Sequence, residues 1–144
     1  MMTVLSHLLR MTLPLVAVLA LTACDASELM APDVRLPDGS AYFGDIEDGL
    51  FHGEGVQEFV SGQVYNGQFR EGYWHGQGEL ESPSGWHYEG EFQKGVMAGQ
   101  GVFKSDGSVY VAEFEAGAPV QGRHITDYGT YQGEFRDWQY HGEG

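Results

Sequence analysis

The chain is poor in cysteine, proline and basic residues. Its 144 residues include one cysteine, five prolines, and seven Lys and Arg against 21 Asp and Glu. A single cysteine excludes an internal disulfide. The formal net charge of −14 repels phosphate groups, which argues against nucleic acid as a partner and against docking on anionic lipid. Few prolines beside 22 glycines indicate tight turns rather than a disordered linker.

The first 24 residues have the pattern of a secretory signal peptide. Residues 1–10 carry one basic side chain, Arg10, and no acidic one, and residues 11–22 form a short apolar run that ends at Ala23 and Cys24. A spanning helix needs about 20 apolar residues, so this run is too short to favour a transmembrane segment. A basic start, a short apolar core and small residues before the cut are typical of a signal peptide.

The end of this segment, Leu21-Thr22-Ala23-Cys24, resembles the lipobox of bacterial lipoproteins. The resemblance implies that residues 1–23 are removed and that Cys24 is acylated, which would anchor the chain to a membrane of the bacterial cell envelope, facing the periplasm. Asp25 is similar to the sorting residue that keeps enteric lipoproteins in the inner membrane. The alternative is an ordinary signal peptide that happens to contain a cysteine. Residues 24–37 are expected to form a flexible tether.

The rest of the chain repeats with a period of 21 to 23 residues. A tyrosine opens each repeat, a small residue follows two positions later, and a large apolar residue follows two positions after that. The tyrosines are Tyr42, Tyr65, Tyr88, Tyr110 and Tyr131; the small residues are Gly44, Gly67, Gly90, Ala112 and Gly133; the apolar residues are Ile46, Phe69, Phe92, Phe114 and Phe135. Four repeats close with Gly-x-Gly, at 53/55, 76/78, 99/101 and 142/144.

This pattern resembles the MORN repeat family and covers residues 38–144 as about five repeats, the last incomplete. The fourth repeat lacks the closing glycine pair, the fifth has Trp138 where a glycine is expected, and the first has Ile46 in the aromatic position. We expect an all-β fold, an elongated single-layer array of stacked β-hairpins. The family serves many biological roles, so the resemblance implies an architecture rather than one function.

The physical pattern supports the same architecture. Tyr65, Gly67 and Phe69 alternate with a period of two, so they share one face of a strand. Turn-forming pairs separate the repeats at Asp38-Gly39, Ser61-Gly62, Ser84-Gly85 and Asp106-Gly107. A lone hairpin is marginal in water, so stacking must bury the aromatic columns as one core.

The sequence does not favour catalysis, a metal site or a cofactor. His52, His75 and His141 occupy one slot of the repeat, and equivalent residues of adjacent two-strand repeats lie about 10 Å apart. Two ligands of one zinc ion cannot be so distant. The chain has no nucleophile motif, phosphate-binding loop or His-Glu-x-x-His. We therefore expect a protein that is not an enzyme and needs no cofactor.

Two surfaces are candidates for binding. The first is an acidic strip, Asp45, Glu91, Glu113 and Glu134, aligned with Gln68 on the face opposite the aromatics. It either keeps the sheet soluble or docks a basic partner. The second is the row of apolar hairpin tips, Leu50-Phe51, Tyr73-Trp74, Val96-Met97, Pro119-Val120 and Tyr140. These side chains either seal one end of the core or form an exposed interaction surface.

The most consistent function is a non-catalytic, membrane-anchored scaffold that binds a protein of the bacterial envelope. Binding would use the tips, the acidic strip or a free strand edge, and the incomplete last repeat predicts self-association or partner binding through the C-terminal edge. One alternative is a carbohydrate or peptidoglycan module that stacks sugars on Tyr73, Trp74 and Trp86. Another is a phospholipid-binding lipoprotein, which must overcome the acidic charge.

Overall fold

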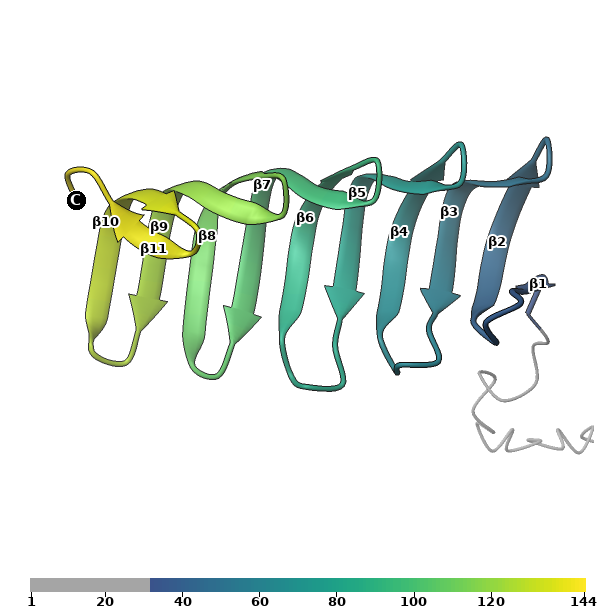
Figure 1. The fold of residues 1–144 in the computed structure, drawn as a ribbon, viewed down its shortest axis with the longest axis horizontal. Coiled ribbons are helices and arrows are strands. Elements are labelled where there is room, and N and C mark those ends of the chain that lie inside the picture. Colours follow the sequence, from purple (N-terminus) through teal and green to yellow (C-terminus); the bar gives the residue numbers. More distant parts are fainter. Residues whose placement is uncertain (1–31) are drawn as a thin grey trace, which may run out of the picture. The chain divides into compact units, whose positions relative to one another are not determined.

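The computed structural model describes residues 32–144, which form β-strands joined by tight turns (Figure 1). The strands are β1 (Val34–Arg35), β2 (Ala41–Glu47), β3 (Leu50–Glu58), β4 (Val64–Arg70), β5 (Tyr73–Glu81), β6 (His87–Gln93), β7 (Val96–Ser105), β8 (Ser108–Glu115), β9 (Ala118–Thr126), β10 (Gly129–Arg136) and β11 (Gln139–His141). Within this described part, no helix is present that could cross a membrane.

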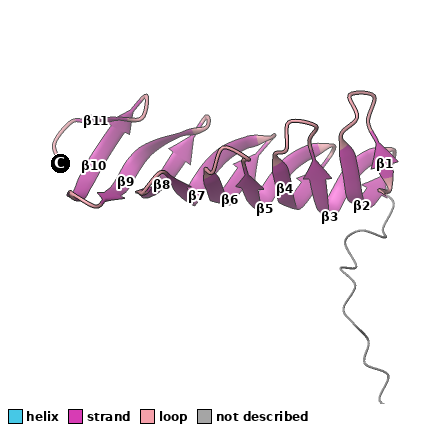
Figure 2. Cartoon of the chain, turned by 90° about the horizontal axis from the view of Figure 1, so that it is seen from below, coloured by secondary structure: helices cyan, strands magenta, loops and turns pink. Residues whose placement is uncertain are grey.

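All eleven strands belong to one antiparallel sheet, and each pairs with its neighbours in sequence order. Figure 2 shows the strands in a single row, with no second layer among the described residues. The expected all-β, single-layer array of hairpins is therefore confirmed. Turns at Asp38-Gly39, Ser61-Gly62, Ser84-Gly85 and Asp106-Gly107 close the lower ends of the hairpins in Figure 1. At the opposite ends, a second set of turns joins β2 to β3, β4 to β5 and so on, and we call these the hairpin tips.

The repeat glycines make room for the phenol ends of the tyrosines. Pairs of glycines face each other across the strands: Gly44 and Gly55, Gly67 and Gly78, Gly90 and Gly101. A β-carbon at Gly78 would lie 2.5 Å from the hydroxyl oxygen of Tyr65. The hydroxyls donate to the carbonyl oxygens three residues on, at 2.8 Å from Tyr42 to Asp45, 2.8 Å from Tyr65 to Gln68 and 3.0 Å from Tyr88 to Glu91. The glycines therefore serve to pack the repeat tyrosines rather than to bind a ligand.

The phenylalanines couple each repeat to the one before it. Phe69 lies edge-on to Tyr65 of its own repeat and to Tyr42 of the preceding repeat, with ring centroids 5.1 Å apart in both cases. Phe92 is placed the same way between Tyr65 and Tyr88. Such edge-to-face aromatic pairs add about 0.5–1.5 kcal/mol beyond the burial of their area. The core is consequently a chain of nearest-neighbour contacts, as in other repeat proteins.

The first repeat shows what happens without a preceding tyrosine. Ile46 occupies the phenylalanine position and is 47% exposed, whereas Phe69 and Phe92 are 3% and 2% exposed. Among the described residues, no repeat precedes it and covers it. An aromatic ring at this position would have gained little, because the tyrosine that buries its counterparts is missing.

The fourth repeat departs from the pattern because Ala112 replaces a glycine. Its β-carbon occupies the space that the tyrosine hydroxyl uses elsewhere, and no hydrogen bond joins Tyr110 to the carbonyl of Glu113. The Tyr110 ring instead stacks on His124, with centroids 4.0 Å apart. His124 is held on both ring nitrogens, by Ser108 and by the Tyr140 hydroxyl.

The end of the predicted tether is already part of the array. Val34 and Arg35 pair with Tyr42 and Ala41, and Val34 packs against the core. The carboxylate of Asp33 accepts a hydrogen bond of 2.9 Å from the Gly44 amide. The last part of the segment expected to be a tether is therefore paired with the first repeat, and a flexible tether before it stays a prediction.

The buried tyrosines should make the fold sensitive to alkali. Burial, followed by the charge of Glu91, raises the pKa of Tyr88 to about 12, and burial also raises the pKa of Tyr65. An unfolded tyrosine titrates near 10, so the folded state holds these protons more tightly. Their contribution to the free energy of unfolding is complete below pH 10 and is lost as the pH rises from 10 through 12.

We expect the phenols of Tyr65 and Tyr88 to ionise only as near-ultraviolet circular dichroism is lost. Phenolate absorbance and circular dichroism would be recorded on the same samples across this pH range. Ionisation of all eight tyrosines in one reversible step, with the dichroism intact, would contradict the assignment.

Candidate functional site

The apolar tip pairs divide between the core and the surface. The first residue of each of three pairs points outward: Leu50, Tyr73 and Val96 are 48%, 57% and 42% exposed. The second residue points inward, since Phe51, Trp74 and Met97 are partly buried and pack against the core. In these three pairs, one residue is therefore exposed and the other packs on the core, and partner binding through the exposed residues stays a prediction.

The outward residues form a row along the array, which we call the tip row (Leu50, Tyr73 and Val96). Each side chain lies over the tip glycine of the following repeat. A β-carbon on Gly72 would lie 3.6 Å from Leu50, and one on Gly95 would lie 3.9 Å from Tyr73. The row thus presents apolar groups at one repeat spacing on a rigid sheet, which is an arrangement suited to docking rather than to chemistry.

The inward residues stack on the repeat tyrosines. Phe51 lies 3.8 Å from Tyr42 between ring centroids, and Trp74 lies 4.6 Å from Tyr65, both nearly parallel. The indole Nε1 of Trp74 also donates a 3.0 Å hydrogen bond to Gln57. A substitution at Trp74 would therefore disturb the core as well as the surface.

The tip of the fourth repeat differs from the one predicted. Ala118 pairs with Glu115 and Pro119 with Phe114, so the tip pair is Ala118-Pro119 rather than Pro119-Val120. Pro119 is fully buried. Because the fourth repeat lacks the closing Gly-x-Gly, its tip could not be aligned with the other tips from the sequence.

Tyr140 combines exposure with packing. It is 56% exposed, yet its ring stacks on Tyr131 at 4.0 Å and its hydroxyl contacts His124 Nδ1 at 2.8 Å. It therefore completes the fifth repeat in the same way that Phe51 completes the first. Its role in partner binding stays a prediction.

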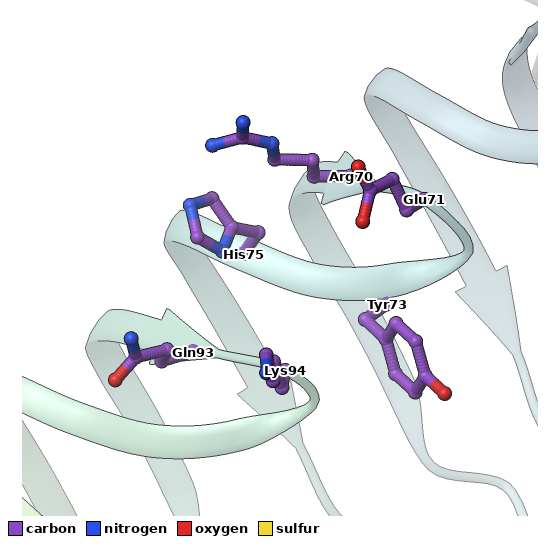
Figure 3. Close-up of a pocket in the computed structure, with 6 residues that line it drawn as sticks. All are labelled: Arg70, Glu71, Tyr73, His75, Gln93 and Lys94. Carbon is purple, nitrogen blue, oxygen red and sulfur yellow. The ribbon is translucent and has the colours of Figure 1, made fainter.

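A cavity of about 430 Å³ lies beside Tyr73 at the tips of the β4–β5 and β6–β7 hairpins. Figure 3 shows the six residues that line it: Arg70, Glu71, Tyr73, His75, Gln93 and Lys94. Two of the seven Lys and Arg residues of this acidic chain, Arg70 and Lys94, line this cavity together with the acidic Glu71. The cavity can accept an anionic group, since Arg and Lys both donate to carboxylates.

The acidic strip is exposed, as predicted, and part of it supports the tips. The side chains of Gln68 and Glu91 fold over Gly76 and Gly99, two glycines with left-handed φ angles of 62° and 58°. Gln68 accepts a 3.1 Å hydrogen bond from the Gln77 amide. Asp45 and Glu134 lie over Gly53 and Gly142 in the same way. The strip therefore shields the tip backbone, and its binding of a basic partner stays a prediction.

The tryptophans proposed as sugar platforms each have one ring face occupied. Trp74 is covered by Tyr65, and Trp86 stacks on Phe103 with centroids 5.8 Å apart. Tyr73, in contrast, is not engaged in an aromatic stack within the described sheet. A sugar would therefore find single, separated platforms rather than a continuous aromatic surface.

One group of possible metal ligands lies far from the tips. The donor atoms of Glu79, Glu81 and His87 lie within 4.8 Å of one another, at the lower end of the β5–β6 hairpin. This group was not predicted from the sequence, because only the histidines of the tip slot were considered as metal ligands. Two features of the sequence could have indicated this group. Glu79 and Glu81 are two residues apart and so share one face of the strand, and the Ser84-Gly85 turn brings His87 opposite Glu81.

Of the three histidines in the tip slot, His52 and His75 line a common cavity beside Arg70. His52 also contacts Glu47 at 3.2 Å, and His141 lies in β11. The expectation that they do not form a common zinc site stays a prediction. Cys24 and Asp25, the predicted acylation and sorting residues, lie outside the described residues.

The structure is a row of β-hairpins with aromatic side chains packed between successive repeats. The MORN repeat family model matches three consecutive segments, residues 42–64, 65–87 and 88–109. The chain is a MORN repeat protein, and such repeats are generally membrane- or protein-interaction modules. A comparison with curated proteins found no match. Strands β8 to β11 continue the same pairing beyond the matched segments.

Proposed function

We propose that this protein is a non-catalytic, membrane-anchored interaction module that binds another protein of the cell envelope along the tip row. The observation that carries the proposal is the repeated exposure of a large apolar side chain at one slot of three consecutive repeats. Binding interfaces place Tyr and other large apolar anchors in such positions. The lipid anchor rests on residues 21–24, as argued from the lipobox.

The cavity beside Tyr73 adds an electrostatic element to this interface. A partner that places an apolar side chain on Tyr73 would bring its neighbouring residues to Arg70 and Lys94. An acidic residue of the partner fits that cavity best, because both cations can donate to its carboxylate. The charge pattern would also reject an additional basic group at this position.

The test is crosslinked affinity purification of the full chain from its own membranes, with a Leu50→Ala/Tyr73→Ala double variant. Trp74 is left intact because its ring supports the core. Loss of an aromatic anchor costs about 2 kcal/mol or more of binding, roughly a 30-fold loss of affinity, so recovery of the partner should collapse. The free energy of unfolding should change by less than about 1 kcal/mol, since these side chains are half exposed.

The matched control is Tyr128→Ala, which removes a fully exposed tyrosine outside the tip row. It should leave partner recovery unchanged. Equal recovery with all three proteins would overturn the tip row as the binding edge. Sedimentation with purified cell wall and flotation with anionic liposomes would then test the carbohydrate and phospholipid alternatives, and β11 would become the next edge to probe.

A further inference from the structure

The outer face of the β5–β6 hairpin carries three metal-ligating side chains. Glu79 and Glu81 are two residues apart on β5, and His87 pairs with Glu81 across the strands. Their donor atoms lie within 4.8 Å of one another, and His87 Nε2 is 2.5 Å from Glu79 Oε1. We propose that these three residues form a binding site for a divalent first-row transition metal ion, with Zn²⁺ the best suited.

The distances fit such an ion after a small adjustment. Two ligands that each bind zinc at about 2.1 Å can be separated by at most about 4.2 Å, and by about 3.4 Å in a tetrahedral site. For a tetrahedral site, the widest separation in the cluster needs to shorten by up to about 1.4 Å, and the contact between His87 and Glu79 needs to lengthen by about 0.9 Å. Imidazole nitrogen with carboxylate oxygen suits zinc and its neighbours better than calcium or magnesium.

The surroundings leave space and negative potential for the ion. A cavity of about 130 Å³ opens beside the cluster, lined by Val64, Asn66, Glu79 and Glu81. Asn66 pairs with Glu79 from the other side, so its amide oxygen can approach as a fourth ligand. Glu89, which also pairs with Glu79, adds a further negative charge, whereas Lys104 beside His87 opposes the ion.

The cluster is a local feature and not a requirement of the repeat. At the equivalent places of the β3–β4 hairpin stand Val56, Glu58 and Val64, and those of the β7–β8 hairpin hold Val102, Lys104 and Val109. The fold is built without ligands at those positions. Only the β5–β6 hairpin, among the described ones, combines Glu-x-Glu with a facing histidine.

Metal binding is tested by titrating Zn²⁺ into the full chain, with Cys24→Ser introduced so that no thiol competes for the ion. Calorimetry should show one saturable ion per chain. Removing a ligand with His87→Gln or Glu81→Gln should weaken binding at least about tenfold, because even changes outside the ligand shell cost 10- to 100-fold. Glu58→Gln and His52→Ala, which change the same residue types elsewhere, should leave binding unchanged.

A variant with the opposite effect separates ligand loss from damage to the fold. Lys104→Gln removes the one basic group beside His87, and we expect it to tighten Zn²⁺ binding by about threefold at moderate ionic strength. Misfolding cannot produce tighter binding. The absence of saturable binding up to about 1 mM Zn²⁺, the weak end of the affinity scale, would overturn the proposal. So would an equal loss of Zn²⁺ affinity in His52→Ala, or unchanged affinity in His87→Gln.

Discussion

Replacing Gly78 with alanine is expected to lower the free energy of unfolding by about 3 kcal/mol, the upper part of the range for overpacking a core. The new β-carbon would lie 2.5 Å from the hydroxyl oxygen of Tyr65, which is completely buried. At about 4 °C or more for each kcal/mol, the midpoint of thermal unfolding should fall by more than about 10 °C. Thermal and urea unfolding followed by circular dichroism would measure the change.

The chain contains a related case at the other position of such a glycine pair, the one equivalent to Gly67. Ala112 occupies a glycine position of the fourth repeat, and there Tyr110 has left the glycine pair and stacks on His124. Tyr65 has no such alternative, because Trp74 already covers its ring and Leu80 lies across from it. An alanine is therefore tolerated where a second aromatic partner exists and should be costly at Gly78.

A double-mutant cycle identifies the clash. In a Tyr65→Leu background the ring is absent, so Gly78→Ala should cost less than about 1 kcal/mol further. If Gly78→Ala costs the same in both backgrounds, the loss comes from the backbone and the explanation through the tyrosine is wrong.

Replacing Phe92 with alanine should have a comparable or larger effect, a loss of about 3–5 kcal/mol. Phe92 is 2% exposed and lies edge-on to Tyr65, Trp74 and Tyr88. These contacts bridge two consecutive repeats. Because stability in an array is a sum of repeat and interface contributions, the variant should also weaken cooperativity between the two sides of the interface. A smaller slope of stability against urea would report that separation.

Ile46→Ala is the matched control for Phe92→Ala. It changes the same slot of the first repeat, where the side chain is 47% exposed, and should cost less than about 1 kcal/mol. Similar losses at the two positions would show that the aromatic slot acts within its own repeat, and the proposed coupling between repeats would fail.

Much of the core could be predicted from the sequence because it depends on local rules. Alternation with period two places Tyr65, Gly67 and Phe69 on one face, and glycine-containing turn pairs mark where the strands reverse. The same alternation could have resolved the tips. Trp74 shares its parity with Gly78 and Leu80, which face the core, so Trp74 points inward and Tyr73 outward.

The candidate sites were less predictable because they depend on pairing across strands. The register shift between Gly67 and Phe69 brings Phe69 opposite Trp74, which alternation within one strand does not predict. The cavity at the tips needs residues from two hairpins, and the Glu79, Glu81 and His87 cluster needs the register of β5 with β6. None of these distances follows from spacing within one strand.

The sequence by itself determined the repeat period, the all-β class, the hairpin turns and the identity of the buried tyrosines and phenylalanines. These features follow from alternation and turn chemistry, which act over a few residues. Tertiary structure alone decided where the array begins, since Val34 packs on the first repeat, and how Tyr110 is placed once Ala112 takes up its space. Those outcomes depend on which surface is left uncovered after the strands have paired, and burial of that surface involves residues that are distant in sequence.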